Sequence, residues 1–331
     1  MNSNAQVASF TSSAEIPAAA LRRHGIRDAV LRNATRSAAI TVLLLLGGVI
    51  ASLIQGSVPA FKAFGLGFFV TETWNPVTEK FGALSPIYGT LVTSFIAMLI
   101  GIPVSMGVAI FITELCPRWL KRPISTAIEL LAGIPSIIYG IWGLFVLAPF
   151  LQKYIQPLLI GLFQGVPVLS SLFAGPPYGI GILTAGIILS IMVLPYITSV
   201  TRDVFETVPA VLKESAYGLG CTTWEVVSRV VLPYTKTGVI GGIMLGLGRA
   251  LGETMAVTFV IGNAHKISSS ILAPGTTISA NIANEFTEAD GVLYTSSLIA
   301  QGLILFLITF IVLACARLLL LRLEMQGGKK V

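Results

Sequence analysis

Two charged residues, Arg249 and Glu253, stand inside a long apolar stretch of the sequence, in the segment GRALGETMAV. Arg249 follows Lys236 by thirteen positions, or about 20 Å along a helix. At that depth in a bilayer a lone arginine costs at least about 2.5–3.5 kcal/mol. Glu253 comes four residues later, on the same face of a helix, and can neutralise the arginine. The planar donor fork of arginine stays charged at every working pH, so this pair predicts a site that attracts an oxyanion, with Glu253 tuning or releasing the arginine.

A purely structural role for this pair, orienting one helix in a bundle, is the alternative. An ion pair is an expensive device for packing, since apolar residues pack without one, and we therefore favour the functional interpretation. Ser136 and Tyr139 are further candidates for the same path, one helical turn apart. Pro135 would free a backbone carbonyl one turn earlier, and Ser136 could bond locally or face a cavity.

A polar segment of modest length, ESAYGLGCTTWEVVSRVVLP at 214–233, separates two apolar stretches. Pro209 is tolerated in the first turn of a short helix that precedes Gly220. Gly220 permits a sharp change of direction because it has no side chain to clash at positive φ. Thr222 or Thr223 can cap a second short helix, with Glu225 in its first turn. We expect Pro233 to break that helix before the next span.

The predicted result is an elbow of two surface helices at the membrane face, able to insert into a groove on a partner protein. An ordinary interfacial amphipathic helix is the alternative.

Several kinds of chemistry have no matching motif in the sequence. It contains no GxxxxGK[ST] phosphate loop, no GxSxG and no HExxH, so the chain is not expected to bind ATP through such a loop. Histidine occurs only at His24 and His265, and the three cysteines (Cys116, Cys221 and Cys315) lack paired spacing. We predict no metal site, no disulfide framework and no cofactor in this chain.

Composition identifies the class of protein. The 331 residues are 54% hydrophobic and 11% charged, with a mean hydropathy of +0.87, whereas soluble domains carry about a quarter charged residues. Apolar runs of about 20 residues can cross a bilayer as helices. The sequence therefore predicts an all-α polytopic membrane protein. The net charge of +6 does not indicate nucleic acid, because the basic residues gather at the ends of the predicted spans.

We predict six spans, at about 38–55, 88–115, 126–150, 180–200, 237–262 and 295–317. Sixteen Lys and Arg residues fall on one side of these spans and four on the other, with Arg249 left inside the fifth. This bias places both termini and the 201–236 loop in the cytoplasm. The predicted organisation is an N-terminal tail at 1–37, a transmembrane domain at 38–322 and a C-terminal tail at 323–331.

The segments on the other side are predicted to carry structure. Residues 56–87 suggest a folded interfacial cap, and 152–178 are too interrupted to span, which predicts an interfacial or re-entrant piece. Residues 264–294 are either a docking face or a solvated loop. In the fifth span Gly238, Gly242 and Gly246 recur every fourth residue, which predicts close packing against another helix.

The elbow resembles the cytoplasmic signature of the permease subunits of bacterial ABC importers. That signature reads Glu-Ala-Ala, three residues, Gly, nine residues, Ile, one residue, Leu-Pro. The matching residues here are Glu214, Ala216, Gly220, Leu232 and Pro233. The sequence departs from the signature at Ser215 and Val230. Together with 132–149 and 248–264, the elbow resembles the PstC-type permeases of phosphate importers, over about residues 38–322. The sister PstA-type permeases carry related motifs.

The resemblance implies a type I ABC importer permease fold in the bacterial inner membrane, and transport of phosphate. It implies three partners: a PstA-like second permease, a PstB-like ATPase dimer that binds ATP and Mg²⁺, and a PstS-like phosphate-binding protein. It also implies that the elbow couples ATP hydrolysis to transport, with Glu214 as a charged contact. Molybdate, sulfate and phosphonate remain alternative substrates, because an arginine fork does not choose among tetrahedral anions. A membrane-embedded enzyme that uses Arg249 and Glu253, or a scaffold without transport, are alternatives of other classes.

Overall fold

The computed structural model describes residues 18–327. The chain divides into two units, residues 1–52 and 53–331, and each is considered by itself. The first unit contains, within the described residues, the N-terminal part of helix α1 (Ala18–Phe64), whose described side chains there are almost all exposed. The first seventeen residues of the predicted N-terminal tail, and Lys329 and Lys330 of the orientation count, lie outside the described residues.

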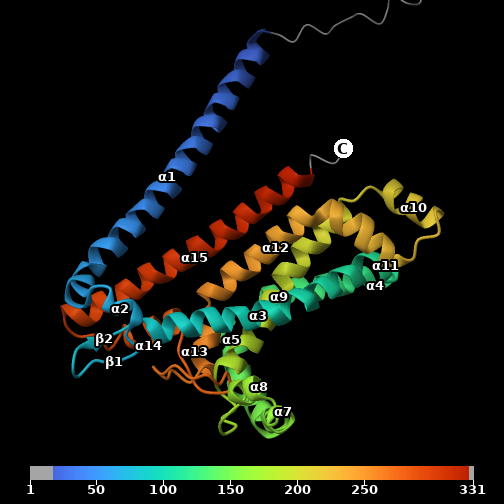
Figure 1. The fold of residues 1–331 in the computed structure, drawn as a ribbon. Helices are drawn as coiled ribbons and strands as arrows, with labels where there is room; N and C mark the ends of the chain where they lie inside the picture. The colour runs from blue at the N-terminus through green and yellow to red at the C-terminus, as the bar shows by residue number, and fades with distance from the viewer. Residues whose placement is uncertain (1–17, 328–331) are drawn as a thin grey trace, which may run out of the picture. The chain divides into compact units, whose positions relative to one another are not determined.

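Six helical stretches within residues 18–327 are long and apolar enough to cross a membrane. They are Val30–Phe64, Leu84–Leu115, Ser136–Phe163, Ile182–Glu206, Thr223–Gly252 and Val292–Leu318. The predicted all-α polytopic architecture is therefore confirmed (Figure 1).

The remaining bounds follow the chain. After α1 come α2 (Gly67–Val70), β1 (Trp74–Asn75), β2 (Lys80–Phe81), α3 (Leu84–Ile110), π-helical η1 (Phe111–Leu115), α4 (Arg118–Ala132), α5 (Ser136–Trp142), π-helical η2 (Gly143–Leu147), α6 (Ala148–Phe150), π-helical η3 (Leu151–Ile155), α7 (Gln156–Phe163) and α8 (Pro167–Leu172). Then follow α9 (Ile182–Glu206), α10 (Ala210–Gly218), α11 (Thr223–Val226), π-helical η4 (Val227–Val231), α12 (Leu232–Gly252), α13 (Met255–Val260), α14 (Ile278–Glu285) and α15 (Val292–Gly327).

The third predicted span, 126–150, is wrong in its position. Helix α4 ends at Ala132, and a new helix begins at Ser136 after Pro135. Proline disfavours helical backbone in the residue before it, so Pro135 breaks the helix completely between Ala132 and Ser136. The new helix continues through η2, α6 and η3 to Phe163, so part of the segment predicted to be interfacial belongs to this span.

The fifth predicted span, 237–262, is also displaced, because the helix starts at Thr223 and ends at Gly252. Pro233 does not break it: the proline lies in the first turn of α12, directly after η4. A π-helical turn bonds each residue to the fifth along the chain. A proline that follows such a wider turn is tolerated without ending the helix, since its missing N–H need not fill the regular ladder.

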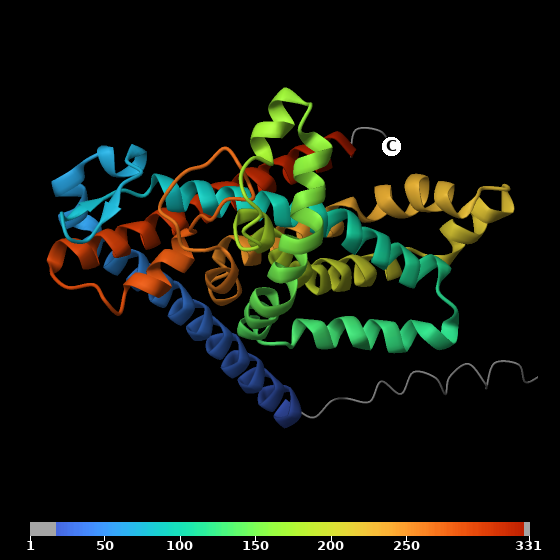
Figure 2. The ribbon, with the colours of Figure 1, turned by 90° about the horizontal axis from the view of Figure 1, so that it is seen from below.

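Helix α9 lies at the centre of the second unit and packs against α3, α12 and α4 (Figures 1 and 2). The predicted glycine face of α12 is confirmed. A β-carbon on Gly238, Gly242 or Gly246 would lie within 3.1 Å of a side chain of α9. These three glycines therefore let the two helix backbones approach closely.

The predicted cap between the first two spans is folded. The strands β1 and β2, of two residues each, form a hairpin that pairs Trp74 with Phe81. Both side chains are buried, and their ring centres lie 4.8 Å apart in an edge-to-face arrangement. Within 264–294, Glu285 turns inward: it accepts a short hydrogen bond from the Tyr294 hydroxyl and lies 3.7 Å from His265 Nε2. The other two acidic residues of this segment, Glu288 and Asp290, are exposed.

Candidate functional site

Arg249 lies on the last turn of α12, at a break in the helix rather than within a continuous span. Gly252 ends α12, Glu253 has extended backbone (φ −71°, ψ 128°), and α13 begins at Met255. One Glu253 carboxylate oxygen accepts weakly from the Ala256 amide at 3.4 Å, and Ser279 donates to the Glu253 carbonyl at 2.8 Å. These bonds satisfy backbone and side-chain groups at the break, where the regular helical ladder is missing.

The predicted Arg249–Glu253 pair exists, but it is loose. Their closest nitrogen and oxygen, Nη2 and Oε2, lie 3.8 Å apart, which is longer than a charge-assisted hydrogen bond of about 2.7–2.9 Å. Arg249 keeps 35% of its side chain exposed, whereas Glu253 keeps 8%. Among the described residues, the buried Nε–H of Arg249 has no hydrogen-bond partner. The guanidinium therefore has N–H groups that are available to bind an anion.

Tyr196 contacts the arginine, and both Tyr196 and Tyr139 bond the end of α4. The Arg249 guanidinium carbon lies 4.7 Å from the centre of the Tyr196 ring. The Tyr196 hydroxyl donates to the Ala132 carbonyl at 3.3 Å. The hydroxyl of Tyr139 donates to the neighbouring Leu131 carbonyl at 2.9 Å. Both tyrosines thus bond carbonyls in the last turn of α4, where the regular helical bond from the fourth residue along the chain is missing. The Leu131 carbonyl also accepts from the Ile134 amide at 3.3 Å.

Tyr139 and Arg249 share one neighbourhood. Tyr139 belongs to the same buried cluster as Ala250, the residue after Arg249, and as Ala256 and Val257. Ser136, the first residue of α5, is half-buried, and its hydroxyl makes no hydrogen bond among the described residues. The structure therefore brings together Arg249, Glu253 and Tyr139, and adds Tyr196, while it gives Ser136 no contact with this group.

Helices α5 and α13, each beginning just after a break, pack directly on one another. Gly140 makes this possible, because a β-carbon there would lie 3.1 Å from the Ala256 α-carbon and 2.8 Å from the Phe259 ring. The arginine therefore sits where two interrupted helices meet. Non-helical backbone within the membrane is tolerated where it is buried in protein or lines a cavity. The two breaks are therefore compatible with a position inside the membrane.

The predicted elbow at 201–236 is confirmed as a structure. Helix α10 begins after Pro209, Gly220 turns the chain with φ +86°, and α11 follows. Thr222 caps α11 in a complete capping box with Glu225: the Thr222 amide donates to the Glu225 carboxylate at 2.9 Å, and the Glu225 amide to the Thr222 hydroxyl at 3.3 Å. Figure 1 shows α10 and α11 at one end of the helices they connect.

The signature residues of the elbow divide into buried and exposed positions. Ala216 is buried in a cluster with Phe205 and Val226, so its small side chain holds α10 against α11. Leu232 is half-buried, and Pro233 is exposed. Glu214 is exposed and makes no ion pair among the described residues. Its carboxylate is therefore available to a partner.

Sequence reasoning missed one contact that holds the elbow in place. Lys213 Nζ lies 2.6 Å from Glu114 Oε1, in η1 at the end of α3. The side chains are 19% and 6% exposed, so the pair is largely removed from solvent. The signal that could have revealed it is Glu114 itself, an acidic residue at the end of an apolar stretch that needs a cationic partner. Glu129, near the end of α4, pairs with Arg202 of α9 at 2.9 Å.

Comparison with known proteins places this geometry in a family. Residues 101–324 match the family of binding-protein-dependent transport system inner membrane components. A phosphate transport system permease protein PstC of Mesorhizobium japonicum is 68% identical over 310 residues, covering 94% of this chain and 95% of that protein. The PstC of Haemophilus influenzae is 52% identical, covering 91% and 96%.

Solved structures show the same fold at low sequence identity. The chain resembles a chain of a bacterial ABC transporter involved in the import of the acidic polysaccharide alginate, with a TM-score of 0.60, 18% identity, and coverage of 91% of this chain and 98% of that one. It also resembles a chain of the inward-facing MetNI methionine ABC transporter, with a TM-score of 0.53, 15% identity, and coverage of 72% and 94%. The expected type I importer permease fold is confirmed by this likeness. The chain belongs to the family of binding-protein-dependent transport system inner membrane components, among the PstC-type phosphate permeases.

Proposed function

We propose that this chain is a membrane-spanning permease subunit that moves inorganic phosphate inward, driven by ATP hydrolysis on a separate subunit. The single observation that carries the proposal is the similarity to phosphate transport permeases over nearly the whole length of both chains. The chain's own part is transport rather than catalysis.

The loosely held Arg249 supports the choice of an anion. Its guanidinium is partly exposed, has an unpartnered buried N–H, and lies 3.8 Å from the one carboxylate near it. A phosphate oxygen would gain a charge-assisted hydrogen bond there, and Glu253 would draw the arginine back once the anion has left. Weak, reversible binding suits a path, because an anion that is held tightly does not move on.

The elbow supports energy transfer from a partner. Glu214 is exposed without an ion pair, while Lys213, the residue before it, is fixed to the end of α3 through Glu114. We infer that a PstB-like ATPase dimer, carrying ATP and Mg²⁺, grips this elbow from the cytoplasm. Closure of the ATPases would then move α10 and α3 together.

Two further partners complete the proposed importer. None of the residues of α4 is buried within this chain, which leaves its surface available to a PstA-like second permease. A PstS-like binding protein would deliver phosphate from the other side of the membrane. Both termini of this chain would lie in the cytoplasm of the bacterial cell, beneath its inner membrane.

Uptake of labelled phosphate tests the proposal. The chain is reconstituted in vesicles with its second permease, ATPase and binding protein, and uptake is measured with ATP and with excess sulfate or molybdate as competitors. We expect ATP-dependent phosphate uptake that neither competitor suppresses. Preferential competition by molybdate would end the phosphate assignment, and uptake without an ATPase would end the ABC mechanism.

A further inference from the structure

A basic pocket lies between α4 and α9, apart from Arg249 and the elbow. Its volume is about 580 Å³, within the range of about 300–1,000 Å³ that is typical of small-molecule sites. Helix α4 supplies six of its residues from one face: Arg118, Lys121, Arg122, Ser125, Thr126 and Glu129. These positions, spaced by three or four residues, form a single stripe along a helix.

Two ion pairs join α4 and α9 across the pocket, and they involve both of the carboxylates that line it. Lys121 pairs with Glu206 at 2.8 Å. Glu129 pairs with Arg202 at 2.9 Å. The Arg202 guanidinium also pairs with Asp203 at 2.8 Å. Every carboxylate that lines the pocket is therefore already bound to a cation.

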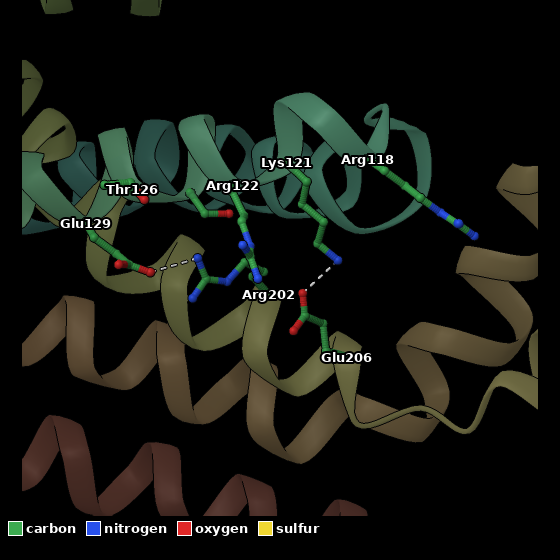
Figure 3. A pocket seen from close by; sticks show the side chains of 8 residues that line it. Arg118, Lys121, Arg122, Thr126, Glu129, Arg202 and Glu206 are labelled. Atoms are coloured by element: carbon green, nitrogen blue, oxygen red, sulfur yellow. Dashed lines mark hydrogen bonds and ion pairs between the residues drawn. The ribbon is translucent and has the colours of Figure 1, made fainter.

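Arg118 and Arg122 are the charges left over. Neither arginine has an ion pair or a hydrogen bond within the part of the chain that the structure describes. Figure 3 shows Arg122 pointing from α4 toward Arg202 on α9, between the two ion pairs, while Arg118 extends from the rim. The guanidinium groups of Arg122 and Arg202 therefore point toward one space, and they repel each other unless an anion lies between them.

The hydroxyls of the pocket are available as well. In α3 and η1, which precede α4, Thr93 and Thr113 each bond the carbonyl four residues back. In contrast, no hydrogen bond within residues 18–327 involves the hydroxyl of Ser125 or Thr126. The pocket thus offers cationic forks and neutral donors together, which is the donor set that phosphate oxygens require.

We propose that this pocket binds a phosphate-type oxyanion, with Arg122 as its central ligand and Arg118, Ser125 and Thr126 as supporting donors. The anion is either free orthophosphate or the phosphate of a lipid headgroup, since both present the same oxygens. In the predicted orientation the pocket lies on the cytoplasmic side. Bound anion would strengthen the link between α4 and α9 beyond the two ion pairs. The inference does not depend on the proposed transport function.

Binding of radiolabelled orthophosphate tests the site. The full chain carries Arg249→Gln, so that binding near Arg249 does not contribute, and is placed in nanodiscs of neutral phosphatidylcholine. The pocket variant adds Arg118→Gln and Arg122→Gln. Arg322→Gln is the matched control, because Arg322 is an exposed arginine of α15 outside the pocket. A second arm uses nanodiscs with phosphatidylglycerol and measures the lipid that copurifies with each variant.

We expect saturable phosphate binding that weakens roughly tenfold or more in the pocket variant and is unchanged in Arg322→Gln. Loss of retained phosphatidylglycerol in the pocket variant alone, without binding of free phosphate, would support the site with a lipid as its source. If both probes bind the pocket variant as well as the parent, or if neither binds the parent, the proposal is overturned. An unchanged thermal unfolding midpoint excludes misfolding, since both substitutions leave the two ion pairs across the pocket in place.

Discussion

The guanidinium carbon of Arg249 lies over the face of Tyr196, 4.7 Å from the ring centre. The carboxylate of Glu253, at 3.8 Å, is the weaker constraint by geometry. A cation over an aromatic ring is attracted by about 0.5–2 kcal/mol, so the ring positions the arginine without occupying its N–H donors. This arrangement keeps the donors of Arg249 free for an anion.

Arg249→Gln is expected to reduce phosphate uptake at least about tenfold, because a neutral amide loses the charge-assisted bond to the anion. Assembly should persist, since Gln keeps a polar side chain of similar reach. Uptake into vesicles and copurification of the partners measure the two effects separately, with Arg322→Gln as the control. Normal transport by Arg249→Gln would remove this residue from the mechanism. Adding Glu253→Gln should restore any lost assembly without restoring uptake.

Gly220→Ala is expected to destabilise the elbow by about 1–2 kcal/mol, because an L-residue is strained at φ +86°. A β-carbon at Gly220 would meet no atom within 4 Å, so backbone strain alone causes the loss. ATP hydrolysis should become uncoupled from uptake, measured as phosphate moved per ATP hydrolysed. Gly218→Ala is the matched control, since it also meets no atom within 4 Å and lies in helical backbone; coupling there should be unchanged. Equal effects at both positions would contradict the explanation.

Glu214→Lys is expected to impair coupling for a different reason. The side chain is exposed and makes no ion pair within the described residues, so reversing its charge should leave the fold of the chain unchanged. We predict normal insertion and thermal stability, with uptake reduced at least about tenfold if a cationic partner contacts this carboxylate. Measurement of ATPase binding to the purified chain, beside uptake, locates the defect. Unchanged binding and uptake would favour a scaffold over a transporter.

Lys213→Met should lower the free energy of unfolding by about 3–5 kcal/mol, because it leaves the largely buried carboxylate of Glu114 without its partner. Lys121→Met removes a lysine from a more exposed pair, Lys121–Glu206, and should cost no more than about 1 kcal/mol. Unfolding in mixed detergent and SDS micelles measures both. The double variant Lys213→Met with Glu114→Gln should recover most of the loss, and failure to recover would show that the lysine acts through packing.

His265 is expected to make the cap sensitive to acid, because its ring stacks on that of Trp74 in the cap, with the ring centres 5.6 Å apart. Burial lowers the pKa of His265 below its ordinary value of 6.5, and Glu285 offsets this only in part. Below pH 6.5 the unfolded cap therefore binds more protons than the folded one, so stability is complete above that pH and declines as the pH falls through it. Hydrogen-exchange protection of residues 68–81, corrected for the intrinsic rate at each pH, measures the effect. His265→Gln should remove the pH dependence, and a persistent decline would assign it to Glu285 or Glu288.

The elbow could be predicted almost residue by residue, because its signals are local. Gly220 supplies a positive φ, and Thr222 with Glu225 supplies a cap, without any help from distant parts of the chain. The glycine face of α12 was also predictable from its spacing, although not its partner, α9.

Three features of the fold and the site could not be predicted: the end of α12, the position of Tyr196 and the role of Pro233. The end of α12 at Gly252 depends on Ser279, 26 residues beyond Glu253, donating to the Glu253 carbonyl. Tyr196 could not be identified as a neighbour of Arg249, because its role depends on where α9 passes relative to α12. Pro233 was expected to end a helix, but the π-helical turn before it has no clear sequence signal.

The adjacent carbonyls of Leu131 and Ala132 accept hydrogen bonds from tyrosines on two different helices, α5 and α9. If α4 rotated about Gly133, both bonds would be strained at once, and neither could lengthen far before it broke. The movement would therefore have a threshold rather than a gradual range, with α4 either fully docked or released.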